Sequence, residues 1–247
     1  MNAIVNFVTT LPIANIRPFE DNPYKVQDNE EMQFLCESIR ENGILSPLLV
    51  RKIGAAEEYE VISGHRRLYA AHKLGLTELP TVTTDLDHNA AAIALVDSNL
   101  HREHILPSEK AFAYKLKMEA LSHQGAACGQ AGHKSRDAVS DTDSGRQVQR
   151  YIRLTCLIPE LLNKLDTGEM ALSIGVELSY LNEQRQRDVL EQYEINACTP
   201  SYSQAVLPQG LNAAETEDYV IKACEHYRKF QRRANRNDEV QHERVMD

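Results

Sequence analysis

Residues 59–71 read Tyr-Glu-Val-Ile-Ser-Gly-His-Arg-Arg-Leu-Tyr-Ala-Ala, which is the pattern of a strand that turns directly into a helix. Tyr59, Val61 and Ser63 alternate along the first half, as the residues of a half-buried strand do. Apolar residues then recur at helical spacing from Leu68 onward. Gly64 is therefore predicted to lie at a strand-to-helix turn.

This turn suits an anion for two reasons. A glycine lets the backbone approach a ligand closely, and the first N–H groups of the following helix point outward. Arg66 and Arg67 would add charge-assisted donors. The turn predicts a cradle for a phosphate or a nucleotide, although an exposed basic helix start accounts for the same residues equally well.

The composition is that of a soluble protein with real cores. The chain has 247 residues, of which 42% are apolar, enough for one to three domains. No apolar run reaches about 18 residues and no basic segment precedes an apolar one at the start, so we expect neither a membrane span nor a secretory signal. Five cysteines are scattered without a C-x-x-C pair, which favours a reduced, cytoplasmic protein without a zinc site.

Short predicted strands alternate with helices up to about residue 106. We expect an extended edge segment at 11–18, a helix capped by Asp28, strands at 48–53 and 81–84, and a helix at 89–98. The pattern then becomes helical, with a helix from Pro107 to about Leu121 and a loop at 122–133. The predicted domains are an α+β domain at 1–106, an all-α domain at 107–210 and a C-terminal helix at 211–247.

Residues 135–157 predict a helix-turn-helix. A short helix at 136–141 and a tight turn precede Ser144, which is placed to cap a second helix three residues before Gln147. Arg146, Gln149, Arg150 and Arg153 follow at i, i+3, i+4 and i+7, so they line one face of that helix. Arg and Gln suit guanine and adenine edges in the major groove. The predicted DNA-binding residues are Ser144, Arg146, Gln147, Gln149, Arg150 and Arg153.

The alternative for this face is ordinary solvation. The net charge of the chain is −9, which argues against a protein that binds nucleic acid over its whole surface. The segment 108–156 nevertheless carries 8 basic and 5 acidic side chains, and residues 144–155 contain no acid. DNA binding is the interpretation that this local excess favours.

The last predicted helix, about 213–235, has an apolar seam. Val220, Ala223, Tyr227, Phe230 and Ala234 follow in alternating steps of three and four, as in about two heptads of a coiled coil. Self-association, packing on the body of the protein and a second phosphate-binding surface all remain open for this helix.

Several motifs occur in a fixed order. They are Asn22–Lys25 (N-P-x-K), residues 38–47 (Ser-Ile-Arg-Glu-Asn-Gly-Ile-Leu-Ser-Pro), Ile62–Arg67, Asn99–Glu103 (N-L-H-R-E) and the predicted helix-turn-helix. Together they resemble ParB-type partition proteins, from Leu11 to about Leu181. The resemblance implies a ParB/sulfiredoxin-like α+β N-terminal domain followed by an all-α helix-turn-helix domain and a C-terminal helix.

The resemblance also implies a nucleotide site for CTP with Mg²⁺. Carried over by matching positions, the nucleotide-binding residues are Lys25, Ser63, Gly64, His65, Arg66, Arg67, Asn99 and Arg102, and the metal ligands are Asn99 and Glu103. Amide and carboxylate oxygens suit Mg²⁺, and Arg forks suit phosphate. His65 and Ser98 stand where the family usually has Glu, and Lys25 stands where Arg is common. The loss of two carboxylates weakens the case for CTP hydrolysis more than the case for binding.

The implied function is a sequence-specific DNA-binding partition protein, a CTP-gated clamp acting at a centromere-like site of a plasmid or mobile element. The implied partners are a palindromic double-stranded DNA site, a second copy of the chain and a ParA-type ATPase, in the cytoplasm at the nucleoid. Residues 1–10 do not look like the family's usual ParA-binding segment. The alternatives are a ParB-like transcription regulator and a small-molecule kinase of the same superfamily. A sulfiredoxin is disfavoured, since the Gly64 turn contains no cysteine.

Overall fold

The computed structural model describes residues 7–54, 57–102, 104–127, 139–140 and 142–196. Contacts divide the chain into two units, Met1–Ile105 with Phe112–Val148, and Leu106–Ala111 with Gln149–Asp247. The predicted domain boundaries at 106 and 210 stay predictions. The predicted C-terminal seam, Val220 to Ala234, lies outside the described residues.

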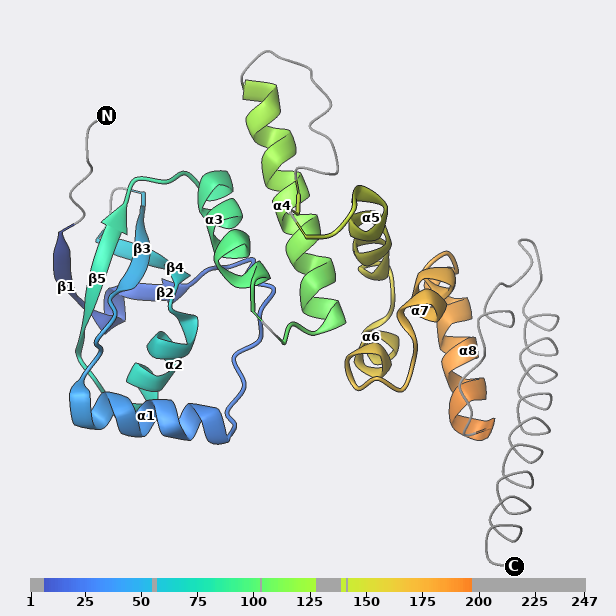
Figure 1. The fold of residues 1–247 in the computed structure, drawn as a ribbon, viewed down its shortest axis with the longest axis horizontal. Helices are drawn as coiled ribbons and strands as arrows, with labels where there is room; N and C mark the ends of the chain where they lie inside the picture. Colours follow the sequence, from blue (N-terminus) through green and yellow to red (C-terminus); the bar gives the residue numbers. More distant parts are fainter. Residues whose placement is uncertain (1–6, 55–56, 103, 128–138, 141, 197–247) are drawn as a thin grey trace, which may run out of the picture. The chain divides into compact units, whose positions relative to one another are not determined.

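A five-stranded mixed sheet forms the centre of the first unit, in the order β1-β5-β3-β4-β2 (Figure 1). Its strands are β1 (Val8–Pro12), β2 (Ile16–Pro18), β3 (Leu48–Ile53), β4 (Glu58–Ser63) and β5 (Glu78–Thr84). β1 pairs with β5 and β3 with β4 in antiparallel fashion, while β3–β5 and β2–β4 are parallel. The predicted edge segment at 11–18 is confirmed, because β1 and β2 are the two edges and each ends at a proline.

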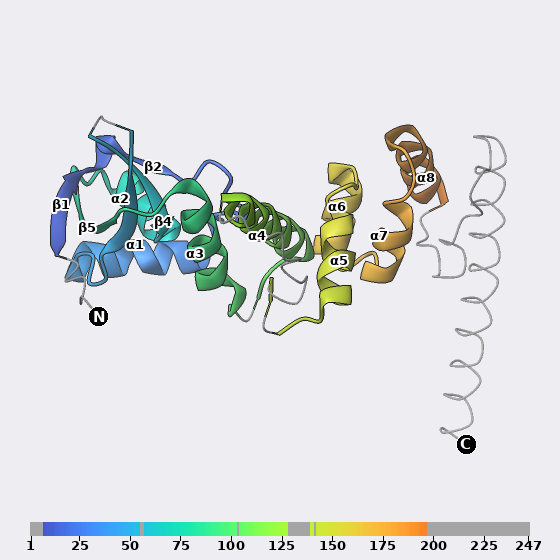
Figure 2. The ribbon, with the colours of Figure 1, turned by 90° about the horizontal axis from the view of Figure 1, so that it is seen from above.

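Neighbouring residues of β4 enter different cores, so both faces of the sheet are covered. Val61 packs with Leu68 and Ala71 of α2 (His65–Leu74), and α2 in turn packs on α1 (Glu30–Asn42). Ile62 packs instead with α3 (His88–Leu100) and with Ala113 and Ala120 of α4 (Pro107–Ala127). Figure 2 shows α3 between the sheet and α4. The sheet thus holds the end of β4 between two helical layers.

Two helix ends differ from the sequence prediction. Asn29, and not Asp28, caps α1: its side chain accepts a hydrogen bond from Met32 N at 3.1 Å, while Asp28 binds Lys73 at 2.7 Å. The predicted loop at 122–133 is wrong for its first six residues, since α4 continues to Ala127. Alanines are strong enough helix formers to carry the helix past Gly125.

The second unit is helical. It contains α6 (Pro159–Asp166), α7 (Leu172–Leu178) and α8 (Glu183–Asn196), and α5 (Gly145–Leu154) runs into it. Their core includes Leu154, Leu161, Leu165, Leu178 and Val189, all nearly or fully buried. Among the described residues, no helix is both long and apolar enough to cross a membrane.

A carboxylate caps the first turn of α4. Asp166, at the end of α6, accepts hydrogen bonds from Ser108 N at 2.9 Å and from Ser108 Oγ at 2.5 Å. The first N–H groups of a helix have no partner within the helix, and the helix dipole favours a negative charge there. This contact joins two parts of the second unit that lie 58 residues apart in the chain.

Candidate functional site

The predicted strand–glycine–helix turn is confirmed. β4 ends at Ser63, Gly64 is the N-cap of α2 with φ of +111°, and α2 begins at His65. A side-chain Cβ at Gly64 would lie 3.0 Å from Leu48 Cγ and 3.1 Å from Arg67 Nη2, so the position requires glycine both for its conformation and for its space. The first N–H groups of α2, which have no partner within the helix, therefore follow directly on a residue without a side chain.

The two arginines of the turn have different partners. Arg66 reaches the surface and donates to Glu31 Oε2 on α1 at 3.1 Å. Arg67 folds back, donating to the carbonyl of Pro47 at 2.9 Å and also to that of Ser46. Arg67 thus fixes the segment before β3 to the turn, whereas Arg66 is held only by an exposed ion pair of a kind that contributes little.

His65 is a neutral hydrogen-bond acceptor. Its Nε2 accepts from Phe19 N at 3.3 Å, which places the ring proton on Nδ1. Burial lowers the pKa of His65 to about 4, with a further lowering by the nearby Arg102 charge, against a smaller raising effect of Glu60. The side chain at this position therefore adds no charge to the turn at neutral pH.

The lowered pKa of His65 predicts a loss of stability on mild acidification. Between pH 7 and pH 5 the unfolded chain gains a proton at His65 that the folded chain does not bind, because the folded pKa is about 4 and the ordinary value 6.5. The cost to the free energy of unfolding is about 2 kcal/mol at pH 5. Urea unfolding at both pH values should show this loss in the wild type.

The variant His65→Gln isolates this contribution, since glutamine can accept from Phe19 N and does not titrate. It should be about 2 kcal/mol less sensitive to the same pH change than the wild type. His72→Gln removes an exposed histidine of the same helix and is the control. An equal pH dependence in His65→Gln and the wild type would contradict a neutral, buried His65.

The second predicted segment lies at the end of α3. Asn99 is 5% exposed, and its Nδ2 donates to Leu95 O at 2.7 Å and to Ser98 Oγ at 3.2 Å. Arg102 follows the helix and lies over the Tyr24 ring at 5.7 Å. Ile62 of β4 lies in one core with Leu95 and Val96 of α3, and Leu100 packs against that core, so the end of α3 and the strand that leads into the Gly64 turn are neighbours. Glu103, the predicted metal ligand, lies outside the described residues.

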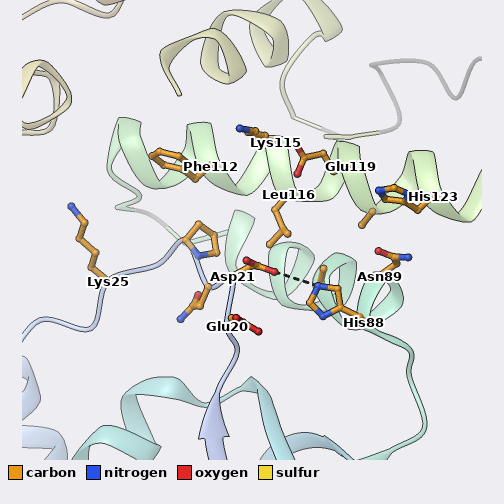
Figure 3. Close-up of a pocket in the computed structure, with 14 residues that line it drawn as sticks. Glu20, Asp21, Lys25, His88, Asn89, Phe112, Lys115, Leu116, Glu119 and His123 are labelled. Carbon is orange, nitrogen blue, oxygen red and sulfur yellow. Dashed lines mark ion pairs between the residues drawn. The ribbon is translucent and has the colours of Figure 1, made fainter. Parts of the chain in front are cut away.

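Lys25 belongs to a different part of the first unit. It lines a pocket of about 610 Å³ together with residues of the segment 20–23, the start of α3 and one face of α4 (Figure 3). Ser63–Arg67, Asn99 and Arg102 do not line this pocket. The cation–π contact between Arg102 and the Tyr24 ring connects the segment that contains Lys25 with the end of α3.

Several contacts around the turn were missed by the sequence prediction. Glu60 is only 4% exposed and pairs with Arg51 at 2.6 Å, while its other oxygen accepts from Glu20 N at 3.2 Å. Phe19 stacks on His88 at 5.1 Å. The sequence signal for these contacts is Glu60 itself, a carboxylate among the apolar residues of a predicted strand. A buried charge needs a partner, so this position predicts an ion pair.

The predicted DNA-binding residues lie on and before α5. Ser144 Oγ accepts from Gln147 N at 3.3 Å, so the predicted N-cap is confirmed. Arg146 is exposed and Gln149 and Arg150 are partly exposed, whereas Val148 is fully buried. Of the predicted first helix at 136–141, only Val139 and Ser140 are described, and neither is helical.

A family model for the ParB N-terminal domain matches residues 2–100, which contain the sheet, the Gly64 turn and α3. These residues form a ParB N-terminal domain. The mixed sheet with its covering helices is this domain, so the predicted recognition and the predicted α+β domain followed by helices are confirmed, while the predicted C-terminal helix lies outside the described residues.

Among curated ParB relatives, a chromosome-partitioning protein Spo0J of Thermus thermophilus is 40% identical over 164 residues, 66% of this chain and 56% of that protein. A nucleoid occlusion protein of Geobacillus thermodenitrificans is 29% identical over 220 residues, 88% of this chain and 70% of that protein. The crystal structure of C-terminally truncated ParB from Caulobacter crescentus complexed with CTP-gamma-S is 27% identical, with a TM-score of 0.36 over 71% of this chain and 93% of that chain. This chain spans little more than half the length of the Thermus protein.

Proposed function

We propose that this chain is a sequence-specific DNA-binding partition protein whose grip on DNA is controlled by CTP. The observation that carries the proposal is the Gly64 turn, which presents the start of α2 beside the end of α3 within a ParB N-terminal domain. Its proposed site of action is a centromere-like sequence of a plasmid or mobile element. The proposed setting is the cytoplasm, at the nucleoid.

The turn is suited to the triphosphate of a nucleotide. Free N–H groups and the positive end of the helix dipole attract phosphate oxygens, and a glycine lets the backbone approach a ligand closely. Arg66 can exchange Glu31 for a phosphate at small cost, because that ion pair is exposed. A neutral His65 does not repel the triphosphate, as a carboxylate at this position would.

Asn99 fits the proposed Mg²⁺ site in part. Both hydrogen bonds of its side chain use Nδ2, which directs the amide so that Oδ1 is the end able to bind a cation. Mg²⁺ usually takes one or two protein oxygens together with substrate phosphates, and it would neutralise part of the triphosphate charge. The second proposed ligand is Glu103. Within the described residues no group of three or more His, Cys, Asp or Glu side chains is placed to hold a metal ion.

Replacing Arg66 with alanine should weaken CTP binding at least tenfold. The change removes a charge-assisted donor to phosphate, an interaction of about 1.5–3 kcal/mol. Isothermal titration of CTP with Mg²⁺ into the wild type and Arg66→Ala measures the difference.

Two variants separate phosphate binding from the loss of a surface ion pair. Lys73 is a second cation of α2, and Lys73→Ala breaks its exposed ion pair with Asp28. This variant should bind CTP as the wild type does. Glu31→Gln frees Arg66 from its partner and should bind equally or more tightly. Equal weakening in Arg66→Ala and Lys73→Ala would contradict the proposed contact.

We propose further that CTP hydrolysis is slow or absent. Attack of water on the terminal phosphate needs an oriented nucleophile and compensation of the developing charge. His65 and Ser98 occupy positions where the family usually has carboxylates, and Ser98 Oγ already donates to Leu95 O at 2.9 Å. A phosphate-release assay with DNA present should therefore give a rate near the uncatalysed background.

The proposed DNA contact is the face of α5, as the second helix of a helix-turn-helix. Arg146, Gln149 and Arg150 share one side of this helix, and Val148 anchors the opposite side in the protein. A helix with Arg and Gln on its outer side suits the major groove. A palindromic site read by a homodimer is the corresponding arrangement, and a ParA-type ATPase is the proposed further partner.

Arg150→Ala should cost about 1–3 kcal/mol of binding to the specific site if Arg150 reads a base, with little change on random DNA. Arg187→Ala removes the same charge from an exposed position on α8 and should have a small effect on both DNAs. Fluorescence anisotropy measures the affinities of the wild type and of both variants for the specific and the random duplex. Equal loss on both DNAs in Arg150→Ala would instead identify a phosphate contact, and no loss on either would remove α5 from the interface.

A second candidate function is a ParB-like regulator that stays at its operator. The similarity over 88% of this chain to a nucleoid occlusion protein, and not only to partition proteins, supports this second candidate. Genome-wide occupancy separates the two functions. A clamp that slides on DNA covers kilobases around its site, whereas a simple regulator is confined to the operator.

A further inference from the structure

Arg153, at the end of the proposed DNA-binding face, is held by the turn after α7. Its Nη2 donates to Ser179 O at 2.9 Å, and its guanidinium carbon lies 4.2 Å from the centre of the Tyr180 ring. Ser179 is the C-cap of α7, where carbonyl groups carry partial negative charge. A hydrogen bond and a cation–π contact therefore fix this guanidinium in direction.

The remaining donors of Arg153 are poorly placed for reading a base. An arginine reads guanine with two neighbouring nitrogens of its fork. In Arg153 the Nε atom is buried and makes no hydrogen bond within the described part of the chain, and one of the two N–H groups of Nη2 is used by Ser179 O, which fixes the direction of the fork. A guanidinium fixed in this way cannot extend into a groove without losing both of its contacts.

The charge of Arg153 nevertheless lies beside the proposed DNA face. Arg153 follows Arg146 by seven residues and Arg150 by three, so it continues the same side of α5. Tyr180 is 62% exposed, which means that the ring supporting Arg153 borders solvent and is not part of the core. A rigid cation at the end of a DNA-binding face suits a phosphate, whose contacts set the position of a protein on DNA.

We propose that Tyr180 is a positioning residue that fixes Arg153 as a phosphate contact, so that Arg153 contributes affinity for DNA of any sequence and Arg150 contributes the specificity. This inference rests on the proposed DNA-binding function. It assigns a role to Tyr180, which lies 27 residues beyond Arg153 and which the sequence pattern of α5 does not include. In this proposal Arg153 binds a phosphate and does not read a base.

The test measures the affinities of the full chain for its selected specific duplex and for a random duplex over a series of salt concentrations. Arg153→Ala should weaken both complexes equally, about tenfold, and should reduce the slope of log affinity against log salt by about 1. Tyr180→Leu should weaken both complexes by a similar or smaller factor. Tyr180→Phe keeps the ring and should bind like the wild type.

Four results would overturn the proposal. Three concern Arg153→Ala: a loss of affinity confined to the specific duplex, no loss on either duplex, or an unchanged salt slope together with a lowered melting temperature. The fourth is an equal loss of affinity in Tyr180→Phe and Tyr180→Leu. Arg150→Ala keeps the two proposals apart: if it loses specific binding while Arg153→Ala binds normally, only the Arg153 assignment fails. A wild type that binds no DNA would overturn both.

Discussion

Gly64→Ala should destabilise the protein by about 2–4 kcal/mol and weaken CTP binding more than tenfold. A non-glycine residue held at positive φ costs of order 1–3 kcal/mol. The new methyl group would also lie 3.0 Å from Leu48 Cγ and 3.1 Å from Arg67 Nη2. Relief of that contact moves Arg67 away from the carbonyls of Ser46 and Pro47, or moves the backbone at the start of α2.

Gly75→Ala is the matched control for this prediction. Gly75 ends the same helix with φ of +70°, but no atom lies within 4 Å of a Cβ placed there. It should therefore show the conformational cost alone, about 1–2 kcal/mol, with CTP affinity unchanged. Urea unfolding and CTP titration of both variants give the comparison. Equal stability losses, or normal CTP binding by Gly64→Ala, would contradict the close approach at the turn.

Gln186→Leu should cost about 3–5 kcal/mol of stability in the second unit. Gln186 is 1% exposed, and its side chain accepts from Ile158 N at 2.8 Å and donates to Cys156 O and Leu181 O, both at 3.0 Å. One amide thus satisfies three backbone groups from two turns. Leucine has a similar volume but leaves those groups buried without partners, each at a cost of about 1–3 kcal/mol.

Gln184→Leu makes the same substitution two residues earlier on α8 and is its control. Gln184 is exposed and donates to Asp188 Oδ1 at 3.1 Å, so its loss should change stability by no more than about 0.5 kcal/mol. Thermal unfolding followed by circular dichroism distinguishes the two variants. A Gln186→Leu protein as stable as Gln184→Leu would mean that the three backbone groups find other partners.

The features that could be predicted from sequence are those with local signals. The alternation of β4, Gly64 at its end and Ser144 before α5 each involve a few neighbouring residues, and each was placed correctly. The joining of the Gly64 turn with the end of α3 followed from the order of the family's motifs, because nothing in either segment alone points to the other.

The features that could not be predicted depend on residues far apart in the chain. Phe19 N donates to His65 Nε2 although the two residues lie 46 positions apart in the sequence. This contact and the burial of the ring keep His65 neutral, so it offers a phosphate no positive charge. Arg153 matches the DNA-binding pattern of α5 in sequence, yet its guanidinium is engaged by Ser179 and Tyr180. Periodicity assigns a residue to a face of a helix and cannot show what the other elements bring to that face.

Affinity selection of genomic fragments with the wild-type chain, with and without CTP and Mg²⁺, tests the central claim most directly. Recovered DNA is sequenced, and random fragments of equal length serve as background. We predict strong enrichment of one palindromic sequence without nucleotide, and CTP-dependent spreading of the recovered DNA into its flanks. Recovery of all fragments alike, or an enriched site whose flanks do not respond to CTP, would contradict a CTP-controlled, sequence-specific DNA-binding protein.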